Sequence, residues 1–215
     1  MTKKLIEFVC TGNNGRSPVA ELLARNHLVQ IGASEEYDAA SSGLMVDYTR
    51  RFVAGQVTDD PKMVGAIISI ARDNMFYSPA EIFTISKALR EGDNAVLLKY
   101  AVSTSTKLMD AERECMYGLL AKMGIPGQVK SGKDQTIARP DTKVVLAMDK
   151  KGLESVGKIY AANSHTPVID TLPRYATGDD REVANAFGKP RGFYRATIEQ
   201  LAREVPLAVD RAVGA

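Results

Sequence analysis

The sequence predicts an α/β fold: an open four-stranded parallel sheet with helices on both faces, carrying a mainly helical insertion. Short continuous apolar runs at residues 3–10 and 143–148 are typical of strands that are buried on both faces. Segments with apolar residues at helical spacing alternate with such runs, which favours parallel strands joined by right-handed crossovers. This alternation stops between residues 45 and 109, where helical patterns occur without a convincing buried strand.

The elements of the predicted core follow one another along the chain. Strands are expected at residues 3–10, 37–41, 143–148 and 167–170. The first strand runs into turn residues, and the helix after them has Pro18 in its first turn, where proline is tolerated, and ends by Gly32. The remaining core helices are expected at residues 111–123, 150–160 and 192–212.

Residues 45–109 form the predicted helical insertion. Ser78 and Glu81 have the spacing of a capping box, and the helix that they begin is expected to end at Gly92. An earlier amphipathic helix is indicated by Val64, Ile67, Ile68 and Ala71. We therefore predict one α/β domain made of residues 1–44 and 110–215, interrupted by the insertion, which is a candidate oligomer contact.

Composition argues against several classes of function. The formal charge of +2 is spread over 215 residues without long basic blocks, which gives no support for a nucleic acid or membrane partner. No apolar stretch approaches the roughly 18 residues of a spanning helix, so we expect a cytoplasmic protein. The two cysteines and two histidines lack ligand spacing, so we expect no metal and no cofactor; Cys115 reads as a core thiol.

Residues 10–17 carry the clearest chemical signal. They read Cys-x5-Arg-Ser between a predicted strand and a predicted helix. In that setting the backbone N–H groups of Thr11, Gly12, Asn13, Asn14 and Gly15 can point into one concavity, and the helix N-terminus adds its own donors and positive dipole end. The loop is therefore predicted to bind a phosphate-like anion.

Three side chains of this loop are candidate catalytic residues. Arg16 has a planar guanidinium that can bind two phosphoryl oxygens, a geometry that lysine cannot match. The field that attracts an anion also favours the thiolate form of Cys10, the predicted nucleophile, and Ser17 is placed to donate a hydrogen bond to it. The alternative is a buried strand-end cysteine with an incidental arginine. A Walker loop fits less well, because no Gly-Lys-Ser/Thr ends the segment.

With these residues the chain resembles the low molecular weight protein tyrosine phosphatase family and its relatives, the thioredoxin-coupled arsenate reductases and bacterial arginine phosphatases. The likeness continues in Ser41-Ser42-Gly43, in residues 144–149, and in the closing segment with Asp170-Thr171-Leu172, Phe187-Gly188 and Tyr194-Arg195-Ala196-Thr197. The resemblance implies that Asn13 holds the loop in shape with Ser42 hydrogen-bonded to it. It covers roughly residues 3–45 and 110–212.

Two departures from the family pattern bear on chemistry. Gly15 stands where the family often has a second cysteine, so a protective disulfide with Cys10 cannot form. Asn185 stands where the family has the aspartate that protonates the leaving group, two residues before an aromatic residue, here Phe187. An amide supplies no proton, so one of three nearby acidic residues is a candidate replacement: Asp179, Asp180 or Glu182.

The sequence predicts a cysteine-dependent phosphatase that acts on phosphotyrosine-like phosphomonoesters through a phosphocysteine, weakened if nothing replaces the acid. Its partner would be a phosphorylated protein or a small aryl phosphate. The alternative is a non-catalytic phosphate or phosphopeptide binder, and less readily an arsenate reductase. The expected substrate-binding residues are Thr11, Gly12, Asn13, Asn14, Gly15, Ser42, Asn185 and Phe187.

Overall fold

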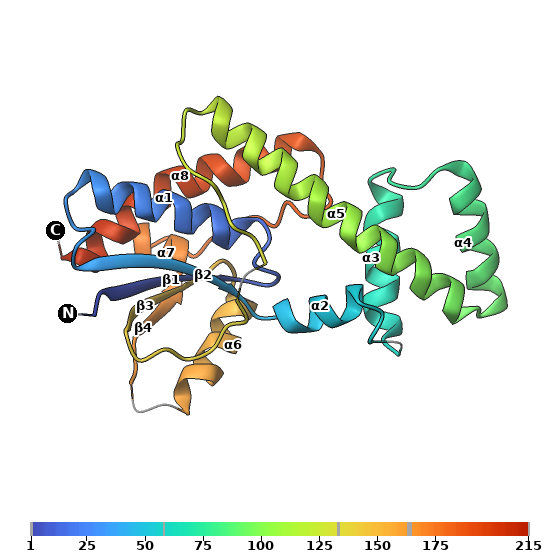
Figure 1. The fold of residues 1–215 in the computed structure, drawn as a ribbon, viewed down its shortest axis with the longest axis horizontal. Coiled ribbons are helices and arrows are strands. Elements are labelled where there is room, and N and C mark those ends of the chain that lie inside the picture. The colour runs from blue at the N-terminus through green and yellow to red at the C-terminus, as the bar shows by residue number, and fades with distance from the viewer. Residues whose placement is uncertain (1, 58, 133, 163–164, 215) are drawn as a thin grey trace.

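The structure is a computed structural model that describes residues 2–57, 59–132, 134–162 and 165–214. Its core is a parallel four-stranded sheet in the order β2-β1-β3-β4 (Figure 1). The strands are β1 Lys4–Cys10, β2 Tyr37–Gly43, β3 Thr142–Ala147 and β4 Val168–Thr171. The predicted fold class is confirmed, and each predicted strand lies within a few residues of its expected bounds.

Helices cover both faces of the sheet, whose central strands β1 and β3 are largely apolar on both. Ile6 and Phe8 of β1 belong to a large core with α1 (Arg16–Gln30), α7 (Leu172–Thr177) and α8 (Arg191–Val213). Val9 points to the opposite face, where it packs with Val156 and Tyr160 of α6 (Lys150–Ala161). This alternation follows from the period of two along a strand.

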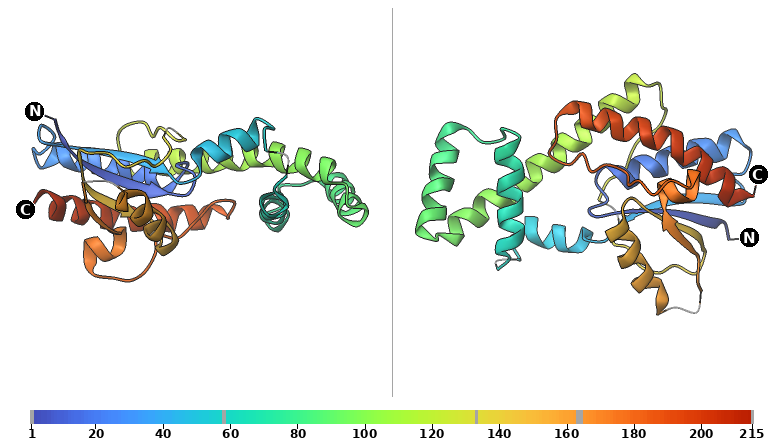
Figure 2. Two further views of the ribbon diagram at one scale, coloured as in Figure 1. Left: turned by 90° about the horizontal axis from the view of Figure 1, so that it is seen from below. Right: turned by 180° about the vertical axis from the view of Figure 1, so that it is seen from behind.

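The insertion contains α2 (Val46–Val53), α3 (Pro61–Asp73), α4 (Pro79–Glu91) and most of α5 (Asn94–Lys122). The expected capping box between Ser78 and Glu81 starts α4, and Gly92 ends it in a left-handed conformation with φ of 69°. These helices have a hydrophobic core of their own, which includes Phe52, Val64, Ile67, Ile68, Ala71, Ile85, Leu97 and Leu108. The insertion extends away from the sheet, as both views in Figure 2 show.

The helix predicted at residues 111–123 is wrong in its start. It is the last part of α5, a continuous helix of 29 residues that begins at Asn94. Residues 103–106 read Ser-Thr-Ser-Thr, which have modest helix propensity, but Thr104 and Ser105 are buried there, and packing outweighs propensity. The proposed domain boundary at residue 110 therefore falls inside a helix, and the domain division itself stays a prediction.

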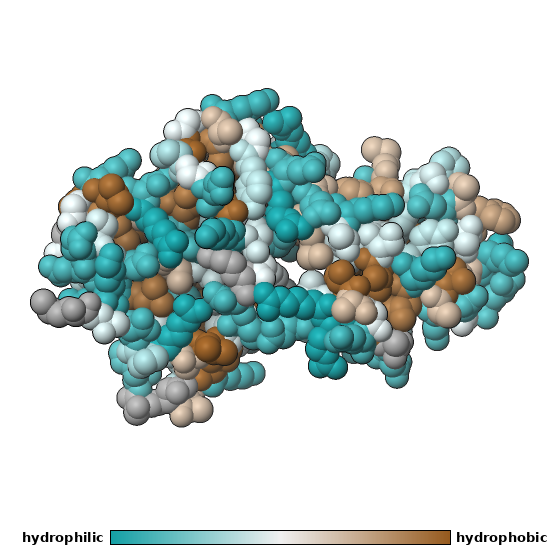
Figure 3. Space-filling view, in the orientation of Figure 1, coloured by the Kyte–Doolittle hydropathy of each residue, from teal (hydrophilic) through white to brown (hydrophobic). Residues whose placement is uncertain are grey.

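α5 belongs to both hydrophobic cores. Leu97 and Leu108 lie in the insertion core, whereas Met116, Leu119 and Leu120 lie in the core of the α/β domain. Apolar residues also reach the surface of the insertion beside α3 (Figure 3), but nothing shows what would cover them, and the oligomer contact stays a prediction. Within the described residues, no helix is long and apolar enough to cross a membrane.

Leu108→Ala tests whether the insertion core contributes to the stability of the whole chain. Leu108 is fully buried, so its truncation should lower the free energy of unfolding by about 2–5 kcal/mol. The control Leu89→Ala, whose side chain is 56% exposed, should change it by less than about 0.5 kcal/mol. Denaturant unfolding measures both. Because α5 is shared by the two cores, a single transition is expected, and a separate early transition for the insertion would contradict this.

Candidate active site

The loop at residues 11–15 connects the carboxyl end of β1 to the first residue of α1, and the end of β2 holds it in place. The N–H groups of Leu44 and Met45 donate to the carbonyls of Cys10 and Thr11 at 3.0 and 2.8 Å. A Cβ added to Gly43 would lie 2.6 Å from the backbone nitrogen of Asn13, so this approach requires glycine. Asn13 itself has φ of 49°, a left-handed conformation that asparagine tolerates better than most residues.

Behind this loop, Ser17 contacts the thiol of Cys10. Its Oγ lies 3.0 Å from Cys10 Sγ and 3.2 Å from the carbonyl oxygen of Ser42, while Asn13 Nδ2 donates to the same Oγ at 3.1 Å. A serine hydroxyl has one proton, so Ser17 can donate to either the sulfur or the carbonyl, and a thiolate would be the stronger acceptor. The expected pairing of Ser17 with Cys10 is therefore present in the geometry.

Ser42 anchors the end of β2 through a buried polar network that sequence reasoning missed. Its hydroxyl donates to Glu7 Oε1 at 2.6 Å and shares a hydrogen bond with Thr136 at 2.9 Å. Tyr160 donates to the other Glu7 oxygen at 3.0 Å, and burial raises the pKa of Glu7. The signal was a glutamate inside the apolar run at 3–10. The contact of Ser42 with this region is made by its backbone carbonyl, which accepts from the hydroxyl of Ser17.

Arg16 is held at the start of α1 by groups from two other segments. Its Nη1 donates to Asp149 Oδ2 at 3.0 Å and to the carbonyl of Val183 at 3.1 Å. Asp149 is itself fixed, because it caps α6 by accepting from the N–H of Gly152 at 2.7 Å. Among the described residues, Nε and Nη2 of Arg16 have no hydrogen-bond partner, so they are available to the oxygens of an anion.

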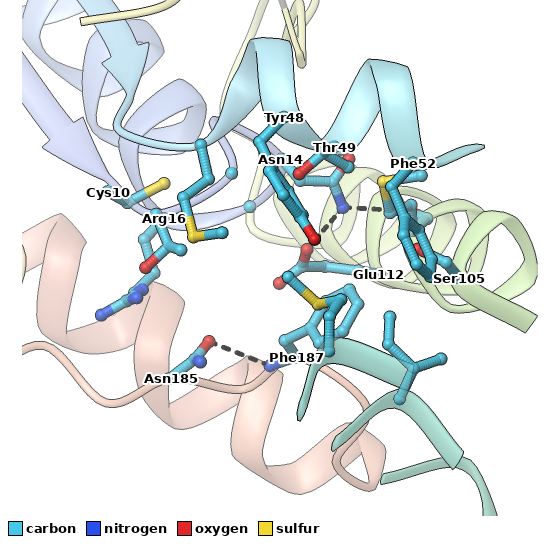
Figure 4. Close-up of a pocket in the computed structure, with 17 residues that line it drawn as sticks. Cys10, Asn14, Arg16, Tyr48, Thr49, Phe52, Ser105, Glu112, Asn185 and Phe187 are labelled. Carbon is cyan, nitrogen blue, oxygen red and sulfur yellow. Dashed lines mark hydrogen bonds between the residues drawn. The ribbon is translucent and has the colours of Figure 1, made fainter. Parts of the chain in front are cut away.

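A cavity of about 190 Å³ lies above the loop, between the α/β domain and the insertion (Figure 4). Its lining includes most of the residues predicted from the sequence, namely Cys10, Thr11, Gly12, Asn14, Gly15, Arg16, Asn185 and Phe187. The other three predicted residues, Asn13, Ser17 and Ser42, are fully buried and support the loop.

The insertion and the adjoining part of α5 supply the rest of the cavity wall, which sequence reasoning did not foresee. Most of these residues are apolar or aromatic, namely Met45, Tyr48, Phe52, Met63, Ile67 and Met109. The polar ones are Thr49, Ser105 and Glu112. The hydroxyl of Tyr48 is engaged with Asp60, and burial together with this bond raises the pKa of Tyr48 to about 12. Tyr48 is therefore neutral and bounds the cavity by its ring.

Glu112 is the exception in this wall. It is only 4% exposed, and its Oε2 accepts a hydrogen bond from Asn14 of the loop. Burial raises the pKa of Glu112, against the opposing effects of the Asn14 bond and the charges of Arg16 and Arg113. A sequence signal existed, because Ser105, Met109 and Glu112 have the spacing of one helix face.

The three acidic residues near Asn185 do not line this cavity. Asp179 accepts from the backbone N–H of Arg181 at 2.9 Å, which contributes most to lowering the pKa of Asp179. Glu182 accepts from the backbone N–H of Lys150 at 2.9 Å, and Asp180 is exposed. Asn185, in contrast, lies at the cavity and accepts from the N–H of Phe187 at 3.3 Å.

Cys115 and the two histidines lie apart from the loop chemistry. Both cysteines are free, and burial raises the pKa of the Cys115 thiol. His27 pairs with Asp210 at 2.7 Å, and His165 contacts the carbonyl of Thr142. The described part of the chain holds no group of three or more His, Cys, Asp or Glu residues that could bind a metal ion.

The geometry of this loop agrees with a comparison of the sequence with known families. A family model described as low molecular weight phosphotyrosine protein phosphatase matches residues 5–57, which include β1, the loop, α1, β2 and α2. The chain resembles the low molecular weight phosphotyrosine protein phosphatases. Among curated proteins, no sequence matches this chain at a significant level.

Solved phosphatase structures of this kind share the fold. A protein tyrosine phosphatase from Entamoeba histolytica has a TM-score of 0.57 at 15% identity, covering 99% of each chain. A low molecular weight phosphotyrosine phosphatase from Vibrio cholerae gives 0.55 at 18% identity, covering 98% of this chain and 97% of that one. The YwlE arginine phosphatase from Geobacillus stearothermophilus gives 0.51 at 17%, covering 97% and 92%. Identities this low support the fold alone.

Selective labelling of the two thiols tests the assignment of the loop. Cys10 lies at the cavity beside Ser17 and the start of α1, whereas burial raises the pKa of Cys115. Iodoacetate near neutral pH should therefore modify Cys10 much faster than Cys115, and inorganic phosphate should protect Cys10 only. Mass spectrometry of native protein measures both rates. Equal rates, or no protection by phosphate, would contradict the predicted anion site.

Proposed function

We propose that this chain is a cysteine-dependent phosphatase that acts on phosphotyrosine-like phosphomonoesters through a phosphocysteine intermediate. The observation that carries the proposal is the contact of Ser17 Oγ with Cys10 Sγ at 3.0 Å, at a cavity bounded by the loop and by Arg16. The family model that matches residues 5–57 supports the same chemistry. The roles of the individual residues are part of the proposal.

The reaction would use the loop in two steps. The Cys10 thiolate attacks phosphorus, while the loop N–H groups and the free donors of Arg16 bind the equatorial oxygens. Ser17 donates to the sulfur, which stabilises the thiolate as nucleophile in the first step and as leaving group in the second. Water then attacks the phosphocysteine and releases inorganic phosphate.

The cavity wall favours an aromatic leaving group. Tyr48, Phe52, Met109 and Phe187 present apolar surface beyond the phosphate loop. An aryl group loses little on leaving water for such a wall, whereas the charged guanidinium of a phosphorylated arginine would have to be desolvated. A phosphorylated protein or a small aryl phosphate is the partner class that fits.

A non-catalytic phosphate or phosphopeptide binder is the second candidate, favoured by the amide of Asn185 at the family's acid position. Such a protein would keep the anion site and show no turnover. An arsenate reductase fits less well, because that chemistry passes a disulfide between cysteines, and Cys115, the second cysteine, is absent from the lining of the cavity.

Turnover of p-nitrophenyl phosphate separates these functions. Cys10→Ser should abolish it and Cys115→Ser should leave it unchanged, because Cys10 is the proposed nucleophile and Cys115 is absent from the lining of the cavity. Arg16→Lys should lower kcat by about 10²–10³-fold, the usual effect of losing a donor to transition-state oxygens. Steady-state kinetics with phosphate-binding calorimetry measures both properties. Wild-type protein that binds phosphate without Cys10-dependent turnover would instead establish the binder.

A further inference from the structure

The carboxyl group of Glu112 occupies the space into which a side chain at position 15 would project. A Cβ built on Gly15 would lie 2.5 Å from Glu112 Oε1 and 3.2 Å from Oε2. The absence of a side chain at Gly15 thus lets α5 bring a carboxyl group into contact with the phosphate loop. This places an acidic group of α5 beside the backbone that would hold the anion.

Among the described residues, one oxygen of this carboxyl group has a hydrogen-bond partner and the other has none. Oε2 accepts from Asn14 Nδ2, which also lies 3.1 Å from the carbonyl of Met109 and so ties the loop to α5. Oε1 has no hydrogen-bond partner among the described residues. Figure 4 shows the carboxyl group between Cys10 on one side and Phe52 and Ser105 on the other, within the lining of the cavity. Oε1 is therefore free to contact a substrate oxygen.

The surroundings of Glu112 favour its neutral form. Burial is the largest influence on its pKa and raises it, whereas Asn14, Arg16 and Arg113 lower it. The charge of Glu112 in turn helps to raise the pKa of Cys115 on α5 and that of Tyr194 on α8. A neutral carboxyl group beside the loop also avoids repelling the anion that the loop binds.

We propose, on the basis of the phosphatase function above, that Glu112 is the general acid of this site and supplies the proton that Asn185 cannot. As the Cys10 sulfur bonds to phosphorus, the bond from phosphorus to the leaving oxygen breaks, and that oxygen takes the proton of Glu112. The oxygen of a water molecule then bonds to phosphorus, the Glu112 carboxylate accepts the proton that this water loses, and inorganic phosphate is the product. The phosphorus–sulfur bond breaks with its electrons returning to Cys10, and both groups regain their starting states.

This assignment gives α5, the helix that the insertion shares with the α/β domain, a chemical role. Ser105, Met109 and Glu112 lie on one face of α5 and all line the cavity. The same helix carries Leu108 in the insertion core and Met116 in the core of the α/β domain. Packing of the insertion therefore determines where the acid lies relative to the loop.

Glu112→Gln, which keeps the shape and removes the proton, tests the proposal through the dependence of the rate on the leaving group. The loss in kcat/KM should be less than about 10-fold for p-nitrophenyl phosphate and should reach about 10²-fold or more for phenyl and alkyl phosphates. Glu114→Gln, on the exposed side of α5, is the matched control and should change neither rate. If the substitution damaged the structure of the loop, kcat/KM would fall by the same factor for all substrates.

The pH profile gives a second readout. A general acid must be protonated, so wild-type kcat/KM for phenyl phosphate should fall as pH rises through the raised pKa of Glu112, and Glu112→Gln should lack this fall. Tyr194, with its pKa raised to about 12, stays neutral over this range. Cys115→Ser should keep the wild-type profile, which separates the Cys115 thiol from the effect.

Asn185→Asp provides a rescue test. In the Glu112→Gln background it should recover part of the rate for phenyl phosphate, whereas in the wild-type background it should add little. If wild-type protein has no Cys10-dependent turnover, the proposed function fails. If wild-type protein is active and Glu112→Gln keeps the wild-type leaving-group dependence, only the role of Glu112 is overturned.

Discussion

The close seating of the loop on the carboxyl ends of β1 and β2 is the constraint on which the site depends. Gly43 approaches the backbone of Asn13 too closely for any side chain, and the following residues hydrogen-bond to Cys10 and Thr11. The buried network of Glu7, Ser42 and Tyr160 fixes the same end of β2 by hydrogen bonds to the neighbouring strand β1. A loop held from two sides can keep its N–H groups convergent without a ligand, which is the preorganisation that anion binding requires.

Arg16 is preorganised in the same way as the loop. One nitrogen of its guanidinium is committed to Asp149 and to the carbonyl of Val183, so the orientation of the fork is set before an anion arrives. Because the side chain of Arg16 is almost fully buried, its charge would be unfavourable there without Asp149. The ion pair therefore serves both the stability of the folded chain and the position of the remaining donors.

α5 couples the two parts of the chain. A helix buried in two hydrophobic cores cannot shift in one without disturbing the other, because protein interiors are close-packed. The cavity lies where these cores meet, with loop residues on one side and α2, α3 and α5 on the other. The insertion is thus part of the candidate active site as well as an addition to the fold.

The sequence by itself determined the sheet, the loop and the roles expected of Cys10, Arg16 and Ser17, because these depend on local patterns: apolar runs, turn residues, and the Cys-x5-Arg-Ser spacing between a strand and a helix. The capping box at Ser78 and Glu81 could be predicted for the same reason. The continuity of α5 through residues 103–106 could not be predicted locally, because burial of Thr104 and Ser105 offsets a weak local preference for helix. The tertiary structure alone decided that Glu112, 97 residues after Gly15 in the chain (112 − 15), would fill the space that this glycine leaves. A contact of that kind depends on how two cores pack around one helix, and no local pattern of residues encodes it.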